Sequence, residues 1–433
     1  MADIRAFRGF RYDMGKVGSL ADVICPPYDV IDPALQQTLY AASPFNAVRL
    51  ELTQEQPGDT ESDNKYTRAA RTLKEWTFDN VLKQDTARGL YVYEQEFTAE
   101  GRTYTRRGFL ARVRLEPFGT GRIFPHEQTL SGPKADRLKL YQATGFNISP
   151  VFGLYPDDAG EVFAALEPLV RTAPPLVAKD HLGVVNRFWP VTDPAIVTKV
   201  IGLMGPKPVF IADGHHRYET GLKYLEEQKA AGNVQDDEAP ANFCLMMLVG
   251  MSDPGLIILP THRLVSGIPA VTAEQIKAAV AEQFDIVGEF DSALPCWEHL
   301  QMDGSQSVLG FGTVADGKWF AAKLRDPAVM ATLAPDQSSE WRGLAVSILH
   351  KLVLEKLVPQ KVGGTPACTY VHLLKEVTDA AAAEACQLAC LVPPCGMHHV
   401  EEIAGNREKM PPKSTYFYPK ILTGLVLHSL KKD

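Results

Sequence analysis

The sequence predicts an α+β protein with a mixed sheet and two domains, and three observations lead to this prediction. The chain has 433 residues, which at roughly 150 residues per domain suggests two or three domains, or one large domain with a companion. Short apolar runs with strand character alternate with amphipathic helical segments. A polar, acidic segment, residues 232–240, is the best linker between a first domain (1–231) and a second, α/β domain (241–433).

The first half of the chain alternates strands and helices. Polar and apolar residues alternate over residues 3–12, which predicts a strand, and residues 47–52 are assigned to another. Asp32 followed by Pro33 caps a helix that runs to about Tyr40. The other elements expected here are a helix (65–81), a hairpin (89–97 and 102–115), a strand from 147, a helix (162–167) ended by Pro168, and a helix (194–204).

The second half follows the same pattern. Residues 242–251 and 256–260 predict buried strands, and Thr261-His262-Arg263 ends the second one. Further strands are expected at 284–290, 307–313 and 318–323, the last two as a hairpin. Helices are expected at 273–284, 341–357 and 380–389.

One predicted corner between a strand and a helix concentrates polar groups. An apolar run, residues 208–212, leads into it, and a helix over 218–229 follows. The corner itself consists of Asp213, Gly214, His215, His216 and Arg217. We expect Asp213 to cap the helix and Gly214 to permit a sharp turn and close approach of a ligand. Helix N–H groups, two imidazoles and a guanidinium would then converge as in a phosphate site, although a hydrogen-bonded structural cluster needs the same residues.

Two further segments offer acidic groups. Pro26 and Pro27 stiffen a loop that presents Tyr28 and Asp29, either at the mouth of a pocket or simply as a rigid turn. His126 and Glu127 lack the second histidine of a zinc-protease motif. Glu127 suits a general base or a magnesium ligand, or an ion pair with Arg137.

Two segments of the second half offer basic groups. His262 and Arg263, at a predicted strand end, either bind an anion or close the turn. The proline-braced, aromatic segment 409–420 is either a docking strand with incidental lysines, or folds back so that Lys413 or Lys420 reaches the anion site.

Cysteine and histidine gather near residue 390, in Cys386, Cys390, Cys395, His398 and His399. Their spacing is not that of paired Cys-x-x-Cys knuckles, and Cys386 and Cys390 would share one face of an apolar helix, as buried cysteines commonly do. The role of this cluster stays open. The odd total of seven cysteines argues against a secreted disulfide framework.

Composition excludes several classes of function. The net charge of −8 disfavours direct DNA binding, which needs a basic face. No apolar run reaches the roughly 18 residues that span a bilayer, and the first ten residues lack a signal-peptide core, so we expect a cytoplasmic location. Walker, dinucleotide-binding and esterase-elbow motifs are absent from the sequence.

Six runs in the same order resemble a family of uncharacterised bacterial and archaeal proteins, domain of unknown function 1015. The resemblance covers almost the whole chain, brings no established activity, and carries only a contextual association with serine biosynthesis. The runs are Cys25-Pro26-Pro27-Tyr28-Asp29-Val30-Ile31, Ser43-Pro44-Phe45-Asn46, His126-Glu127-Gln128-Thr129, Ala212-Asp213-Gly214-His215-His216-Arg217-Tyr218-Glu219-Thr220, Leu259-Pro260-Thr261-His262-Arg263 and Met410-Pro411-Pro412-Lys413-Ser414-Thr415-Tyr416-Phe417.

The Asp213–Arg217 corner is also similar to the ParB and sulfiredoxin-like fold, which includes nucleotide-binding partition proteins, a sulfinic-acid reductase and kinases of free serine. This resemblance spans only a short motif. It implies that Asp213, Gly214, His215, His216 and Arg217 form the corner that holds nucleotide phosphates. The same resemblance implies a catalytic base, for which we choose Glu127, with Asp29 second.

These expectations favour a phosphotransferase that acts on a small hydroxylated metabolite, most simply free serine, with ATP or ADP as donor and Mg²⁺. Asp213 or Glu127 would hold the metal or accept the hydroxyl proton, and His215 would act with them. The substrate would be held by Tyr28, Asp29, His126, His262, Arg263 and Lys413. A ParB-like, non-catalytic nucleotide-binding regulator and a hydrolase of a phosphorylated metabolite remain alternatives, so the sequence does not decide whether the protein is an enzyme, nor its oligomeric state.

Overall fold

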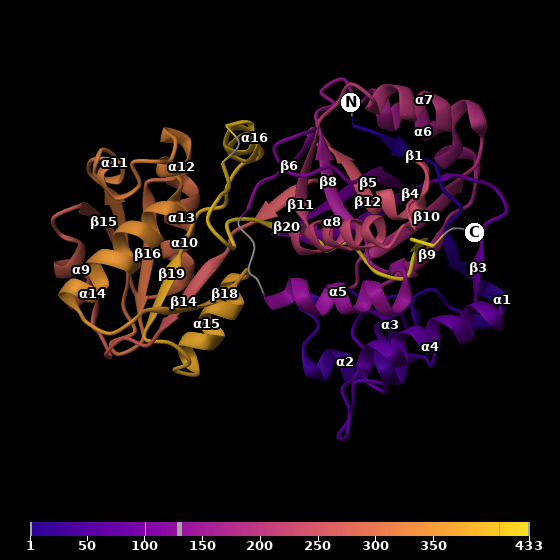
Figure 1. The fold of residues 1–433 in the computed structure, drawn as a ribbon. Coiled ribbons are helices and arrows are strands. Elements are labelled where there is room, and N and C mark those ends of the chain that lie inside the picture. Colours follow the sequence, from indigo (N-terminus) through magenta and orange to yellow (C-terminus); the bar gives the residue numbers. More distant parts are fainter. Residues whose placement is uncertain (1, 100, 128–131, 407, 432–433) are drawn as a thin grey trace. The chain divides into compact units, whose positions relative to one another are not determined.

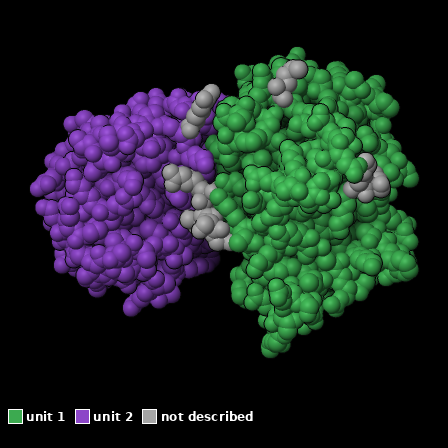
Figure 2. Space-filling view, in the orientation of Figure 1, with its two compact units in different colours: residues 1–125, 129–256, 419–433 green, residues 126–128, 257–418 purple. Residues whose placement is uncertain are grey.

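The protein consists of two compact units, shown in different colours in Figure 2. The computed structural model describes residues 2–99, 101–127, 132–406 and 408–431. Unit 1 comprises residues 1–125, 129–256 and 419–433, and unit 2 comprises residues 126–128 and 257–418. The chain therefore leaves unit 1 after residue 256 and returns to it at Pro419.

Unit 1 is built on a mixed sheet, as the predicted fold class requires (Figure 1). Its strands follow the order β6-β11-β8-β12-β5-β4-β10-β9, and β1 also pairs with β5. The β6–β11 and β8–β12 pairs are parallel, and the other pairs are antiparallel. The bounds are β1 (Ile4–Arg5), β4 (Leu90–Ala99), β5 (Arg102–Arg114), β6 (Ile123–Pro125), β8 (Val151–Tyr155), β9 (Leu176–Lys179), β10 (Val185–Val191), β11 (Val209–Asp213) and β12 (Phe243–Gly250).

Helices surround this sheet. α8 packs on α5, α5 packs on α4, and α6 pairs with α7 (Figure 1). Two short two-stranded sheets, β2–β3 and β7–β21, complete the unit. Their bounds and those of the helices are α1 (Met14–Val17), η1 (Tyr28–Val30), α2 (Pro33–Ala42), α3 (Val48–Glu51), α4 (Lys65–Phe78), α5 (Gly132–Thr144), α6 (Glu161–Thr172), α7 (Pro194–Met204), α8 (His215–Ala230), η2 (Pro240–Asn242), β2 (Phe10–Tyr12), β3 (Leu82–Gln84), β7 (Phe146–Asn147) and β21 (His428–Ser429).

The segment 232–240, expected as the linker, lies inside unit 1, between α8 and β12. β12 is an apolar strand buried between β8 and β5, so it belongs to the unit 1 sheet. The boundary between the two units therefore falls later than the acidic composition of 232–240 suggested.

Unit 2 also combines helices with a sheet. Its six strands, in the order β15-β17-β16-β19-β14-β18, pair antiparallel throughout. Alternate residues supply two apolar clusters: Phe311 packs with η3 and α9, while Trp319 and Leu391 pack with α10. Since both faces bury apolar side chains, the sheet is sandwiched between helices.

The elements of unit 2 have the following bounds. The strands are β13 (Ile257–Leu259), β14 (His262–Ser266), β15 (Phe284–Phe290), β16 (Val308–Thr313), β17 (Trp319–Leu324), β18 (Ala367–Val371), β19 (Leu388–Leu391) and β20 (Tyr416–Tyr418), with β13 pairing β20. The helices are α9 (Ala273–Val280), α10 (Ala293–Asp303), α11 (Val329–Leu333), α12 (Ser339–Gly343), α13 (Ala345–Ser347), the π-helix η3 (Ile348–Leu357), α14 (Val358–Lys361), α15 (Leu374–Ala382) and α16 (Met397–Gly405).

Several element predictions are confirmed and others are wrong. The Asp32 side chain caps α2 as expected, and the β4–β5 and β16–β17 hairpins form. Residues 47–52 contain the helix α3 and no strand, and α6 continues past Pro168. The helix predicted over 380–389 ends at Ala382, and Cys390 lies on β19. All four β19 residues are buried between two helical layers, so the strand lacks the alternation that identifies half-exposed strands.

The close pairing of β5 with β12 gives a stability prediction. A Cβ at Gly108 would lie 2.3 Å from the carbonyl oxygen of Leu248, so Gly108→Ala should destabilise unit 1 by about 1–3 kcal/mol through overpacking. Gly202→Ala is the matched control, because a Cβ at this exposed position of α7 meets nothing within 4 Å. It should stabilise the helix by about 0.5–1 kcal/mol. Urea unfolding of both variants measures the difference, and equal stabilities would contradict the prediction.

Candidate functional site

The corner between β11 and α8 depends on Gly214. Gly214 has φ 85° and is itself the N-cap residue of α8. A Cβ on it would lie 2.8 Å from Nε of Arg217, so the position excludes side chains for both backbone and packing reasons. The prediction that Asp213 caps the helix is wrong, because Asp213 is the last residue of β11 and the N-cap residue is Gly214, which has no side chain to cap α8.

Asp213 is held between two cations. Its Oδ1 accepts a hydrogen bond from Nζ of Lys420 at 2.9 Å, and its Oδ2 accepts one from Nη2 of Arg217 at 2.7 Å. Burial alone would raise the pKa of Asp213, but Lys420 and Arg217 lower it well below its usual value, and His215 acts in the same direction. The carboxylate therefore stays ionised, and it is a weak proton acceptor at neutral pH.

This geometry does not fit a magnesium ion at Asp213. Both carboxylate oxygens already accept hydrogen bonds from cations, and a metal ion would have to displace them. Elsewhere in the described chain, no group of three histidine, cysteine or acidic side chains has an arrangement suited to a metal ion.

Lys420 reaches the corner because the C-terminal segment returns to the unit 1 sheet. Arg106, fully buried on β5, donates to the Pro419 carbonyl and to Gln95, whose side chain in turn donates to the Lys420 carbonyl at 3.1 Å. Burial lowers the pKa of Arg106 to about 10, with Asp213 among the groups that oppose the shift. The alternative in which Lys420 folds back onto the corner is confirmed.

Arg217 is less accessible than the sequence suggested. The residue is only 3% exposed, and its Nη1 donates to the carbonyl of Pro150. His215 is also buried, whereas His216 and Gly214 are partly exposed. The partly exposed residues of the corner are thus Asp213, Gly214 and His216, with the guanidinium of Arg217 against Gly214.

A second set of side chains in unit 1 acts on the same guanidinium. Burial lowers the pKa of Arg217, but Asp213, Asp29, Glu51 and Tyr28 raise it, with a net rise. Tyr28 lies under the Arg137 guanidinium, 4.1 Å from its ring centroid, and its N–H donates to Oε1 of Glu51 at 3.3 Å. The loop carrying Tyr28 and Asp29 is therefore electrostatically linked to the corner, and Asp29 is exposed.

Glu51 is a carboxylate that the sequence analysis missed. It is 1% exposed, and its Oε1 accepts from Ser149 at 3.0 Å, with Nη1 of Arg137 at 3.7 Å. Its Oε2 has no hydrogen-bond partner among the described residues. In the strand predicted over residues 47–52, Glu51 would face solvent. A helical assignment of residues 48–51 would have removed this reason to place Glu51 on the surface.

His126 and Glu127 belong to unit 2, where they support the segment after Met410. His126 is fully buried, and its Nε2 lies 2.8 Å from Oγ1 of Thr415. Oε1 of Glu127 accepts a hydrogen bond from the N–H of Lys413 at 2.6 Å. Lys413 has a φ of 58°, rare for a residue other than glycine, and its side chain is exposed. Gln128 and Thr129, the rest of this run, lie outside the described residues.

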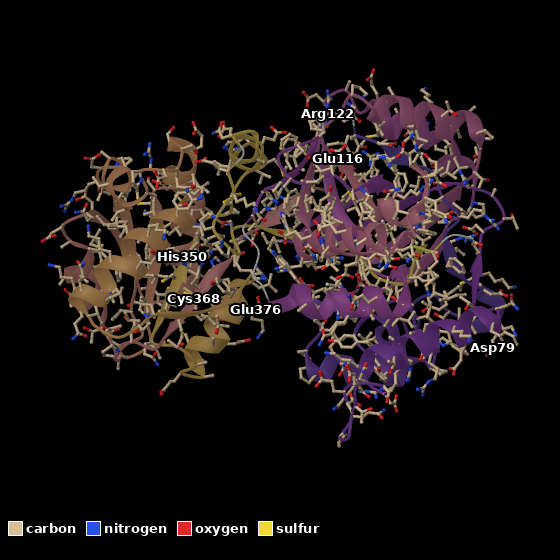
Figure 3. All side chains as sticks on the ribbon, in the orientation of Figure 1. Asp79, Glu116, Arg122, His350, Cys368 and Glu376 are labelled. Carbon is tan, nitrogen blue, oxygen red and sulfur yellow. The ribbon has the colours of Figure 1, made fainter. Side chains whose placement is uncertain are left out.

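Arg263 clamps the other side of the same peptide. Its Nη2 donates to the Lys413 carbonyl at 2.9 Å, Nη1 donates to the Thr261 carbonyl, and Nε donates to His350 at 3.2 Å. Figure 3 labels His350 on η3 and Cys368 on β18, which both adjoin this guanidinium. Since Arg263 is 1% exposed, these contacts correspond to the turn-closing alternative rather than to direct contact with a substrate.

His262 is likewise internal. It opens β14 rather than ending β13, and its Nδ1 accepts from the N–H of Val392 at 3.2 Å. Trp297 packs edge-on against it, with ring centroids 5.0 Å apart. Burial, followed by the charge of Arg263, lowers the pKa of His262 to about 3. The imidazole is therefore neutral over the physiological range.

The cysteines are all free thiols. Burial raises the pKa values of Cys386, Cys390 and Cys395, which keeps these thiols protonated. His399 is engaged with the main chain, accepting from the N–H of Gly396 at 3.0 Å.

None of the helices formed by described residues has the length and apolar character that crossing a bilayer requires.

The chain belongs to the family described as "Protein of unknown function (DUF1015)", which it matches over residues 4–347. The resemblance to this family is thereby confirmed, with five of the six sequence runs inside the matched residues and the sixth, Met410–Phe417, beyond them. No protein with a curated description matches the chain.

Several solved structures are similar at low identity. A free serine kinase in complex with AMP has 12% identity and a TM-score of 0.33, covering 68% of this chain and 83% of its own. A conserved hypothetical protein from Pyrococcus furiosus has 13% identity and a TM-score of 0.33, covering 69% and 89%. SbnI from Staphylococcus aureus, truncated at its C-terminus, has 11% identity and a TM-score of 0.32, covering 72% and 85%. Values this low transfer neither site nor activity to this chain.

Neutral, buried His262 predicts a pH-dependent stability of unit 2. The pKa of His262 is about 3 in the folded protein, whereas the ordinary pKa of a histidine is 6.5. The unfolded chain therefore takes up the proton first as the pH falls below 6.5. Stability from this group is complete above that value and is lost below it, by about 2 kcal/mol at about pH 5. His262→Asn, which keeps an acceptor near Nδ1 but does not titrate, should flatten this loss.

Denaturant unfolding between about pH 7 and 4.5, followed through tryptophan fluorescence, measures this difference, since Trp297 contacts His262 and contributes to the signal. The exposed His181, replaced with Asn, provides the matched control. Parallel stability curves for the wild type and His262→Asn would rule out the neutral buried state.

Proposed function

We propose that unit 1 binds the phosphates of ATP or ADP at the Asp213–Arg217 corner and transfers a phosphoryl group to a small hydroxylated metabolite such as free serine. The observation that carries this proposal is the pair of cations, Lys420 and Arg217, that Asp213 holds at the N-terminus of α8. Asp213 is the acid that pairs with Lys420 and Arg217, and Arg106 is also close enough to interact with it. Phosphoryl transfer depends chiefly on such charge neutralisation and on positioning.

The donor phosphates would contact Gly214 and His216, which are partly exposed at the start of α8. Arg217 and Lys420 would act from behind, as fixed positive charges oriented by Asp213. His215, buried beside Asp213, adds to the same field when protonated. Asp213 would thus be a positioning residue rather than a base or a metal ligand.

A general base for the substrate hydroxyl is available in the same unit. Asp29 is exposed and acts on Arg217, so we place the base role on it, whereas Glu127 is engaged with the N–H of Lys413. The substrate hydroxyl oxygen would bond to the terminal phosphorus while the bond to the bridging oxygen breaks. The hydroxyl proton would pass to Asp29 and the shortened nucleotide would leave. Glu51, which is 1% exposed, would act on the site through the charge of Arg217 and would not contact the substrate.

Lys420→Met tests the charge of the corner. Loss of this cation should weaken nucleotide binding about tenfold or more and lower transfer with it, since the corner would lose one of the two positive charges that offset Asp213. Lys223→Met is the matched control, because Lys223 is an exposed lysine of α8 that forms an ion pair with Glu226 on the same helix. Calorimetric titration with ADP and ATP provides the affinities. Unchanged affinity in Lys420→Met would refute the phosphate assignment.

Asp29→Asn separates transfer from binding. Removal of a general base should lower transfer by about a hundredfold or more and leave nucleotide affinity within about twofold. In the assay, the protein is incubated with a mixture of amino acids and with nucleotide labelled in its terminal phosphate, and the label is followed. In a parallel incubation, the protein receives phosphoserine and no labelled nucleotide. Label on serine supports the kinase. Retained nucleotide without transfer would instead identify the nucleotide-binding regulator, and phosphate released from phosphoserine would identify the hydrolase.

A further inference from the structure

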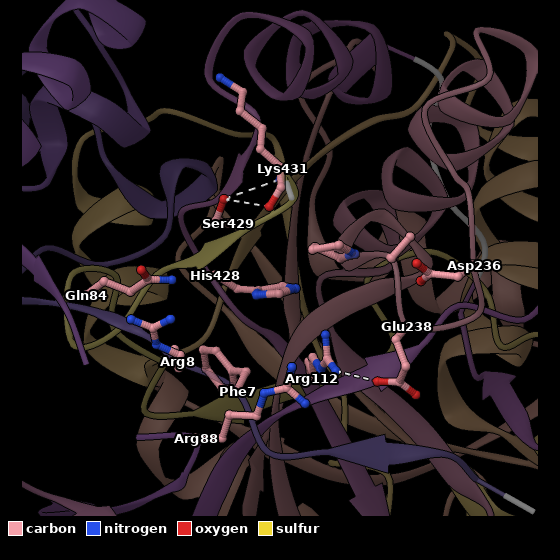
Figure 4. A pocket seen from close by; sticks show the side chains of 12 residues that line it. Phe7, Arg8, Gln84, Arg88, Arg112, Asp236, Glu238, His428, Ser429 and Lys431 are labelled. Atoms are coloured by element: carbon pink, nitrogen blue, oxygen red, sulfur yellow. Dashed lines mark hydrogen bonds and ion pairs between the residues drawn. The ribbon is translucent and has the colours of Figure 1, made fainter. Parts of the chain in front are cut away.

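Cavities also lie away from the corner. The cavity shown in Figure 4, in unit 1, is lined by residues such as Arg112 and Glu238, which already bind each other at 2.8 Å. A larger cavity, of about 390 Å³, lies in unit 2. Its volume falls within the range of roughly 300–1,000 Å³ that is usual for small-molecule sites.

Separate segments of unit 2 form this larger cavity. They are the end of α11 with the turn that follows it, the helix α12, one side of the π-helix η3, and a pair of prolines after α16. Trp341 on α12 and the two prolines, Pro411 and Pro412, supply apolar surface. Small-molecule sites combine such apolar walls with a few polar groups that orient the ligand.

The winding of η3 brings two polar side chains to the cavity. Hydrogen bonds in this helix join residues five apart, as from the N–H of Val358 to the Val353 carbonyl. His350 and Glu355 are also five residues apart, and both line the cavity. In an α-helix they would be separated by about 1.4 turns and would point in different directions. Turns of π-helix are rare and frequently occur at functional sites.

His350 offers a hydrogen-bond donor. Its Nε2 accepts from Nε of Arg263 at 3.2 Å, since a guanidinium N–H can only donate. Burial, and then the charges of Arg263 and Lys351, lower the pKa of His350 to about 4, so the ring is neutral at physiological pH. Its single ring hydrogen is therefore on Nδ1.

This hydrogen is available to a ligand. Arg263, to which Nε2 of His350 is turned, is 1% exposed and lies outside the lining of the cavity. Nδ1 of His350 is not fully buried, and the described part of the chain provides no acceptor for it. A ligand that suits His350 therefore carries an acceptor, such as a carboxylate.

The charged residues of the lining leave one acid unpaired. Lys351 and Glu355 form an ion pair at 2.7 Å, so their charges offset each other. Asp336 is exposed, and its side chain forms neither an ion pair nor a hydrogen bond with any described residue. The lining therefore has a net negative charge, which disfavours a simple anion and favours a ligand that also carries a positive group.

We propose that this cavity of unit 2 binds an amino acid with an apolar side chain, in its zwitterionic form. The ligand carboxylate accepts from Nδ1 of His350, and the ligand ammonium group faces Asp336. The apolar side chain packs against Trp341 and the two prolines of the lining. Trp341 is held in place by its own hydrogen bond, from Nε1 to the Lys409 carbonyl at 3.0 Å.

Calorimetric titrations of the full-length protein with leucine and two analogues test this site. Isoamylamine is leucine without its carboxylate, and isocaproate is leucine without its ammonium group. Leucine should bind about tenfold more tightly than either analogue, because each analogue loses one charge-assisted contact. Leucine has no hydroxyl group to accept a phosphoryl group, so failure of the function proposed for unit 1 does not affect this result.

Two variants separate the two ends of the ligand. Asp336→Asn should weaken leucine binding about fivefold to tenfold and leave isocaproate binding unchanged, because only the ammonium group loses its partner. His350→Leu should weaken leucine and isocaproate alike and leave isoamylamine binding unchanged. Glu298→Gln is the matched control, because Glu298 is an exposed carboxylate of α10 in the same unit that does not line the cavity.

The outcomes are distinct. No binding of leucine, equal binding of leucine and isocaproate, or unchanged leucine affinity in Asp336→Asn would overturn the proposal. Thermal unfolding of each variant without ligand shows whether a loss of binding is a loss of folding. The surface variant Asp336→Asn keeps the test decisive even if His350→Leu, which removes the acceptor for Arg263, fails to fold.

Discussion

Compensation of the buried charge of Asp213 is the constraint on which the candidate site depends. A largely buried, ionised carboxylate at the end of β11 is tolerated only with cations against it, and Arg217 and Lys420 supply them. Arg217 comes from the helix that follows directly, whereas Lys420 comes from the segment that rejoins unit 1 after unit 2. The corner is therefore complete only when the segment that begins at Pro419 has folded onto the part of unit 1 that contains Asp213 and Arg217.

The same constraint separates the roles of the acidic residues. Asp213 is surrounded by cations and has a lowered pKa, so it orients charge instead of accepting protons. Glu51 is buried with one oxygen unsatisfied among the described residues, and Asp29 is exposed to solvent. These three carboxylates thus act on the guanidinium of Arg217 from three different environments. Carboxylates in different environments can have different roles in one site.

In unit 2 the polar residues that match the family's sequence runs mainly hold the backbone. Glu127 and Arg263 bind the N–H and the carbonyl of Lys413, and this explains how a lysine persists in the left-handed region. The side chain of Lys413 is exposed as a result. Arg263 itself is satisfied by carbonyl groups and by neutral His350, so a buried guanidinium can be accommodated here through hydrogen bonds.

The sequence by itself determined the elements whose signals are local. Asp32 with Pro33 started α2, and the apolar run before Gly214 placed β11 and α8 on either side of a glycine corner. Only the tertiary structure decided that Lys420 pairs with Asp213, 207 residues away, that Glu51 lies on a helix, and that Cys390 lies on a strand. Caps and turns depend on neighbours a few residues apart, whereas burial and charge pairing depend on which strands become adjacent in the sheet.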